Sequence, residues 1–77
     1  MKRFSRRAVI EGLQDQTMVL RYNDWFILNA GWKVEDVHGN ILGYVTDVDA
    51  WYIRNAFEPG ELKESKGWDN NSYRLNK

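Results

Sequence analysis

The stretch from residue 31 to residue 53, GWKVEDVHGNILGYVTDVDAWYI, constrains the fold of this chain most. Asp36 and Gly39 are spaced for a type I turn, in which the first residue accepts backbone N–H bonds and the fourth tolerates positive φ. Apolar and charged residues alternate before this turn, in residues 32–35, as is typical of half-buried strands. After the turn, a period of two places residues 42, 44, 46 and 48 on one face and residues 41, 43, 45 and 47 on the other. The stretch therefore predicts a β-hairpin.

Other short segments also have the composition of strands. Residues 17–22 (TMVLRY) predict a strand, and residues 25–28 (WFIL) are apolar on both faces, as a central strand is. Residues 51–53 (WYI) predict a further strand, with a helix over 49–57 capped by Asp49 as the rival. Residues 7–14 are ambiguous: Ser5 as a cap favours a helix over 5–14, but two β-branched residues and Gly12 favour a strand, which we prefer.

These segments predict a mainly β fold of about five strands, either a small SH3-like barrel or a strongly bent antiparallel sheet. Closing a sheet removes edges that promote aggregation. The alternative is an α+β fold with a helix at 5–14, at 49–57, or at both. The 77 residues predict one domain, with a basic arm at 1–6, a β-rich domain at 7–58 and a polar tail at 59–77. That tail begins in a Glu58–Glu61 type II turn and is either disordered or ends in a short docking strand at 72–75.

The composition excludes several classes of protein. The chain has no cysteine, so neither disulfides nor thiolates can stabilise it. No apolar run approaches the roughly 18–20 residues of a membrane span, and the first residues are not a signal peptide, so we expect a cytoplasmic protein without a membrane partner. The net charge is zero, but residues 1–21 hold five basic and two acidic residues, whereas residues 22–58 hold two basic and six acidic ones. That distribution is not typical of a dedicated duplex-DNA binder.

The hairpin stretch resembles the opening of a PRC-barrel, an SH3-like module found in photosynthetic reaction-centre subunits and in the ribosome maturation factor. The resemblance covers residues 31–53, and little after Pro59 continues it. It implies a non-catalytic docking module that binds protein or ribonucleoprotein partners and has no shared active site. The matching residues are Gly31, Val34, Asp36, Gly39, Leu42, Gly43, Val45, Asp47 and Val48.

No catalytic or metal-binding pattern is evident in the residues. His38, the only histidine, falls in the predicted turn, and no serine or cysteine is spaced to form a nucleophile with it. Asp47 and Asp49 share one strand face if the strand reaches them, but a solvated surface is the simpler interpretation. We therefore predict that the protein is not an enzyme and has neither a cofactor nor a metal site.

The aromatic residues are the best candidates for function. If residues 25–28 and 51–53 are strands, neighbouring rings point to opposite faces, so we expect at least one of four rings to be exposed or to lie in a contact between copies of the chain. We predict a non-enzymatic binding or regulatory module, of the kind found among phage and mobile-element accessory proteins, that acts through a protein–protein interface; a homo-oligomer is also possible. The predicted partner-binding residues are Trp25, Phe26, Trp51, Tyr52, Asp47 and Asp49. The alternative is a single-stranded nucleic-acid or RNA–protein binding module that uses aromatic stacking and a basic arm of Lys2, Arg3, Arg6 and Arg7.

Overall fold

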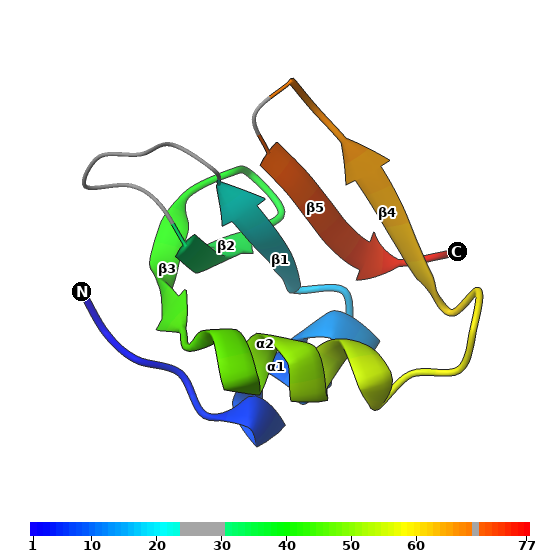
Figure 1. Ribbon diagram of the computed structural model, residues 1–77, viewed down its shortest axis with the longest axis horizontal. Helices are drawn as coiled ribbons and strands as arrows, with labels where there is room; N and C mark the ends of the chain where they lie inside the picture. The colour runs from blue at the N-terminus through cyan, green and yellow to red at the C-terminus, as the bar shows by residue number, and fades with distance from the viewer. Residues whose placement is uncertain (24–30, 69) are drawn as a thin grey trace.

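The computed structural model describes residues 1–23, 31–68 and 70–77 (Figure 1). Within these residues five strands form one antiparallel sheet in the order β3-β2-β1-β5-β4, and two helices lie together on one side of it. The predicted mainly β fold with about five strands is confirmed, and the sheet is accompanied by two helices. Along the chain the elements are α1 (Arg6–Gln14), β1 (Met18–Asn23), β2 (Gly31–Asp36), β3 (Ile41–Val45), α2 (Asp47–Asn55), β4 (Leu62–Lys66) and β5 (Asn70–Leu75).

The hydrophobic core lies between the two helices and one face of the sheet. Three neighbouring strands each contribute one buried residue to it, and each helix contributes two. Burying a side chain of this size stabilises the fold by about 1.5–3 kcal/mol, so these few residues fix how the helices lie on the sheet. The buried set is Val9 and Leu13 from α1, Leu20, Val34 and Val45 from the strands, and Ala50 and Ile53 from α2.

The preferred strand over residues 7–14 is wrong, because these residues form helix α1. Ser5 is the N-cap, and its Oγ accepts a hydrogen bond of 3.2 Å from the Ala8 N–H. Gly12, which argues against a helix in isolation, lies in close contact with β1: a Cβ there would overlap the Met18 side chain. The close packing that glycine allows outweighs its low helix propensity here.

The predicted strand over residues 51–53 is also wrong, because these residues lie in helix α2. Thr46 is the N-cap, with its Oγ1 accepting a 3.2 Å bond from the Asp49 N–H, so the helix begins earlier than the rival interpretation placed it. Acidic residues in the first turn and Arg54 in the last turn complement the helix dipole. A run of three apolar residues fits both the strand period of two and the helix period of 3.6. The helix is favoured because it buries Ala50 and Ile53.

The predicted hairpin is confirmed as β2 and β3. The Asp36 Oδ1 accepts bonds from the His38 and Asn40 N–H groups at 2.8 and 2.9 Å, and the Gly39 N–H donates to the Asp36 carbonyl at 3.1 Å. Gly39 has a φ of 87°, which glycine adopts without strain.

The C-terminal residues are strands rather than a disordered tail. β5 starts at Asn70, two residues before the predicted docking strand, and lies between β1 and β4 in the sheet. The turn before β4 is as expected, with a 3.0 Å bond from the Glu61 N–H to the Glu58 carbonyl and a φ of 91° at Gly60. The sequence of β4, LKESK, shows no apolar alternation because this strand forms an edge with exposed side chains, where lysines deter further pairing.

The N-terminal residues run along the outer edge of β3. The Phe4 N–H donates to the Tyr44 carbonyl and the Tyr44 N–H donates to the Lys2 carbonyl, both at 2.9 Å. Phe4 also packs against the core, and a Cβ at Gly43 would overlap the Phe4 ring and the Lys2 carbonyl oxygen. Residues 1–6, which we expected to form an arm separate from the domain, thus include a segment bonded to the sheet.

Candidate functional site

Helix α2 presents a row of exposed apolar side chains on the side away from the core. The exposed fractions are 68% for Val48, 59% for Trp51 and 49% for Tyr52. Their spacing of three and four residues places them on one face of the helix, opposite the buried Ala50 and Ile53. We call these three side chains the α2 ridge.

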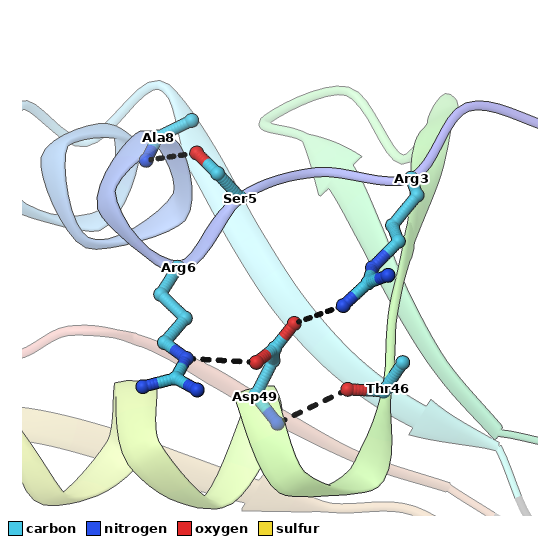
Figure 2. A network of polar contacts seen from close by, with 6 residues as sticks. All are labelled: Arg3, Ser5, Arg6, Ala8, Thr46 and Asp49. Atoms are coloured by element: carbon cyan, nitrogen blue, oxygen red, sulfur yellow. Dashed lines mark hydrogen bonds and ion pairs between the residues drawn. The ribbon is translucent and has the colours of Figure 1, made fainter.

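Asp49 lies beside this ridge but is buried, with an exposed fraction of 6%. Its Oδ1 accepts a 2.8 Å bond from Arg6 Nε, and its Oδ2 accepts a 3.2 Å bond from Arg3 Nη2 (Figure 2). The bonds from Arg6 and then Arg3 lower the pKa of Asp49, so the carboxylate is ionised at neutral pH. The predicted partner-binding Asp49 therefore ties the N-terminal segment and α1 to α2.

The two arginines belong to an open pocket of about 540 Å³ between the N-terminal segment, α1 and α2. We call it the arginine pocket. Arg7 also lines it and makes a 3.5 Å ion pair with Glu11, with both side chains largely exposed. Lys2, the fourth basic residue of the predicted nucleic-acid site, instead has its Nζ 5.1 Å from the centre of the Phe4 ring. The full lining is Arg3, Phe4, Ser5, Arg6, Arg7 and Asp49.

Arg6 connects the arginine pocket to the α2 ridge. Its guanidinium carbon lies 4.3 Å from the centre of the Tyr52 ring, a distance typical of a cation–π contact. The hydrogen bond to Asp49 raises the pKa of Arg6, which keeps its positive charge next to the ring. An apolar and a cationic surface are thus continuous along one side of α2.

The other predicted site residues are distributed differently. Asp47 is exposed in the first turn of α2, next to the ridge. Trp25 and Phe26 lie outside the described residues. The prediction that at least one ring would be exposed is confirmed by Trp51 and Tyr52, although the element is a helix and not a strand. Val48 is not among the predicted partner-binding residues, because its spacing from the two rings is a signal only once a helix is assumed.

Other exposed apolar side chains lie on separate parts of the surface. Trp68, after β4, is 99% exposed, and the β2–β3 hairpin exposes Val37, Ile41 and Leu42. The second face of the sheet holds a polar cluster in which Arg21 Nε lies 2.9 Å from the Glu35 carboxylate. Glu35 is buried there, so this pair has a structural role in the sheet.

The described residues contain no group of three metal-ligating side chains that could hold an ion. No helix in this part of the chain is long and apolar enough to cross a bilayer.

Comparisons with known proteins give no relative. No protein-family model matches the chain, and searches of the curated proteins and of the solved structures found no match. The resemblance to PRC-barrels over residues 31–53 stays a prediction.

Proposed function

We propose that this chain is a non-enzymatic cytoplasmic binding module and that the α2 ridge is its interface with another protein. The observation that supports this most is the exposure of Val48, Trp51 and Tyr52 together on one helix face. Tryptophan and tyrosine are enriched among the residues that dominate binding energy at protein interfaces. A helix face with apolar side chains at this spacing also suits a hydrophobic groove in a partner.

The charges around the ridge define the chemistry of the partner surface. Arg3, Arg6 and Arg7 lie along one side of α2, and their side chains are partly or largely exposed. Complementarity then favours a partner that places acidic groups beside its apolar groove. Asp47 at the start of α2 gives the opposite charge, which would orient the partner along the helix. A docking module of this kind agrees with the role that the PRC-barrel resemblance implies.

A capture experiment with matched tryptophan variants tests the proposal. The wild-type protein, Trp51→Ala and Trp68→Ala serve as baits, and the captured protein is then purified and titrated against each. We expect Trp51→Ala to weaken binding at least ~30-fold, as loss of a buried aromatic anchor does. Trp68→Ala should bind like the wild type, because Trp68 lies outside the ridge. Equal losses in the two variants, or none in either, would refute the assignment.

Sedimentation of the wild-type protein separates a partner protein from a second copy of this chain. We expect a monomer at micromolar concentration. A dimer that Trp51→Ala dissociates would assign the ridge to self-association and overturn the proposal of a different partner protein.

Binding of single-stranded nucleic acid is the second candidate function. It is favoured by one observation, the position of the arginine pocket beside the exposed rings of Trp51 and Tyr52. Phosphate contacts weaken steeply as salt increases, so titration with an unstructured oligonucleotide at several salt concentrations tests it. Saturable binding with a steep salt slope, lost in Trp51→Ala, would favour this candidate over the first.

A further inference from the structure

The arginine pocket has more positive charge than its own carboxylate neutralises. Three guanidinium groups line it, whereas Asp49 is the one acidic residue among the described residues that form its wall. Each guanidinium has five N–H donors, and the two bonds to Asp49 use one from Arg3 and one from Arg6. The pocket therefore presents a surplus of positive charge, of which Glu11 beside Arg7 offsets a part, together with further N–H donors.

The start of α1 adds to this surplus. Arg6 and Arg7 occupy the first turn of a nine-residue helix, and that turn has no acidic residue. The N-terminal end of a helix dipole is positive, so cations there disfavour the helix. The exposed ion pair between Arg7 and Glu11 offsets little of this. A bound anion would make the same arrangement favourable.

Asp49 holds two of the arginines in place before any ligand arrives. Its buried carboxylate contacts Arg3 with one oxygen and Arg6 with the other, and the Tyr52 ring supports the guanidinium of Arg6. Figure 2 shows both side chains converging on Asp49 from the N-terminal segment and from the start of α1. A planar guanidinium fixed in this way loses little freedom when it binds two oxygens of an anion.

We propose that the arginine pocket binds a phosphate group on a phosphorylated side chain of the partner protein. The inference rests on the proposed function, because the pocket adjoins the α2 ridge through Arg6 and Tyr52. A phosphomonoester has a charge of about −1.5 to −2 at neutral pH and three acceptor oxygens, which match the surplus charge and donors.

The charge of the rest of the chain favours a single phosphate over a polyanion. Residues 22–58 hold two basic against six acidic residues, and the whole chain is neutral. A nucleic-acid backbone needs basic residues along an extended path. Here Arg3, Arg6 and Arg7 converge on one pocket instead.

A titration with phosphorylated amino acids followed by ¹H–¹⁵N correlation spectra tests the proposal. The probes are O-phosphoserine and O-phosphotyrosine, with serine and glutamate as controls, all at one ionic strength. We expect saturable shifts of amides in residues 3–9 and 46–52 with the phosphorylated probes alone. Shifts of equal size with glutamate, or no saturable shifts, would overturn the proposal.

Two arginine variants change the net charge equally at different places. Arg7→Ala removes a pocket side chain that is 89% exposed, so the fold should tolerate it, and Arg74→Ala removes an exposed charge on β5. We expect Arg7→Ala to weaken phosphoserine binding ~10-fold, as loss of a charge-assisted bond does, and Arg74→Ala to leave it unchanged. Arg6→Lys keeps the charge but loses the planar fork, and should also weaken binding. Equal effects of Arg7→Ala and Arg74→Ala would refute a specific pocket.

Further variants and probes separate this inference from the proposed function. Trp51→Ala should leave binding of free phosphoserine intact while it removes binding of the partner protein. If partner binding depends on Trp51 but not on Arg7 or on phosphatase treatment of the partner, the ridge stands and the phosphate site is wrong. Binding of an oligonucleotide more tightly than of the phosphorylated probes would assign the pocket to nucleic acid and also overturn the inference.

Discussion

Gly12 illustrates how one missing side chain shapes the core of this protein. It lies in α1, where the Met18 side chain of β1 fills the space that a Cβ would occupy. In an exposed helix, replacing glycine by alanine stabilises the helix by about 1 kcal/mol. For Gly12→Ala, the gain in helix propensity and the loss of packing space have opposite effects on the stability of the fold.

We expect Gly12→Ala to lower the free energy of unfolding by about 1–3 kcal/mol, because overpacking forces Met18 or α1 to shift. Chemical denaturation measures this change, with Gln14→Ala, at an exposed position of the same helix, as the control. A second variant that combines Gly12→Ala with Met18→Ala should lose less unfolding free energy than the sum of the losses in the two single variants. A more stable Gly12→Ala protein would contradict the packing described here.

Asp49 predicts a specific dependence of stability on pH. Its pKa in the folded protein is lowered below the ordinary value of 3.8, mainly by Arg6 and Arg3. The stabilisation by its charge is therefore present above the unfolded pKa and is lost as the pH falls through the lower folded pKa.

We expect Asp49→Asn to have a lower Tm than the wild type at pH 7, and the difference to shrink as the pH falls below about 3.8. Thermal unfolding followed by circular dichroism over pH 2–7 measures it. Asp36 also has a lowered pKa, through bonds from Asn40, so Asp36→Asn is the matched control for a carboxylate outside the pocket. A difference between wild type and Asp49→Asn that stays constant down to pH 2 would contradict the role of the ion pairs.

At the scale of elements, β3 depends on segments from both sides. β2 pairs with its inner edge, and residues 2–4 bond to its outer edge at Tyr44. Gly43 makes the second contact possible, since a side chain there would overlap Phe4 and the Lys2 carbonyl oxygen. The N-terminal segment thereby covers part of a sheet edge that would otherwise be open to pairing with another chain.

We expect Gly43→Ala to displace residues 2–4 and to lower the free energy of unfolding by about 1–3 kcal/mol. Hydrogen exchange at the amides of Phe4 and Tyr44 reports the displacement directly, because each donates one of the bonds between the two segments. Leu42→Ala, at an exposed position of the same strand, should leave both amides protected. Unchanged protection of the two amides from exchange in Gly43→Ala would show that residues 2–4 keep their position even when Gly43 gains a side chain.

The positive φ of Gly39 in the β2–β3 turn can be tested by substitution. We expect Gly39→Val to cost at least ~1 kcal/mol of unfolding free energy, because a β-branched residue resists a φ of 87°. No atom outside its neighbours lies within 4 Å of a Cβ built at Gly39, so the cost is one of backbone conformation. Gly39→Asn should cost less, since asparagine tolerates positive φ. Equal stabilities of the three proteins by urea denaturation would rule out the turn geometry.

The elements differ in how far the sequence predicts them, and the reason is physical. The β2–β3 hairpin is predictable because Asp36 and Gly39 act within a few residues of the chain. α1 and α2 are not predictable in this way. Gly12 is explained only by its contact with Met18, and residues 51–53 are too few to distinguish the strand period of two from the helix period of 3.6.

The α2 ridge is only partly predictable for the same reason. The exposure of Trp51 and Tyr52 can be predicted, but Val48 lies on the same face as they do only if the segment is a helix. The arginine pocket depends on Asp49 meeting residues more than 40 positions earlier in the chain, which no local pattern encodes.

At the scale of the whole molecule, the helix layer also carries the proposed interface. α1 and α2 bury one side of each helix in the core, and α2 leaves its apolar ridge outside. The arginine pocket lies where the N-terminal segment meets both helices, so residues 3–7 and Asp49 come together beside the ridge. The β4 edge, with its exposed charged side chains, is by contrast unsuited to pairing.

Site-specific photocrosslinking tests the assignment of the α2 ridge most directly. A benzoylphenylalanine is placed at Val48 in one protein and at Ile41, which is 54% exposed on the β2–β3 hairpin, in another. Both are irradiated under conditions in which the wild-type protein binds its partner. We predict a covalent adduct with another protein from position 48 and none from position 41. An adduct from position 41 alone, or no adduct from position 48 while the complex forms, would show that the α2 ridge is not the interface.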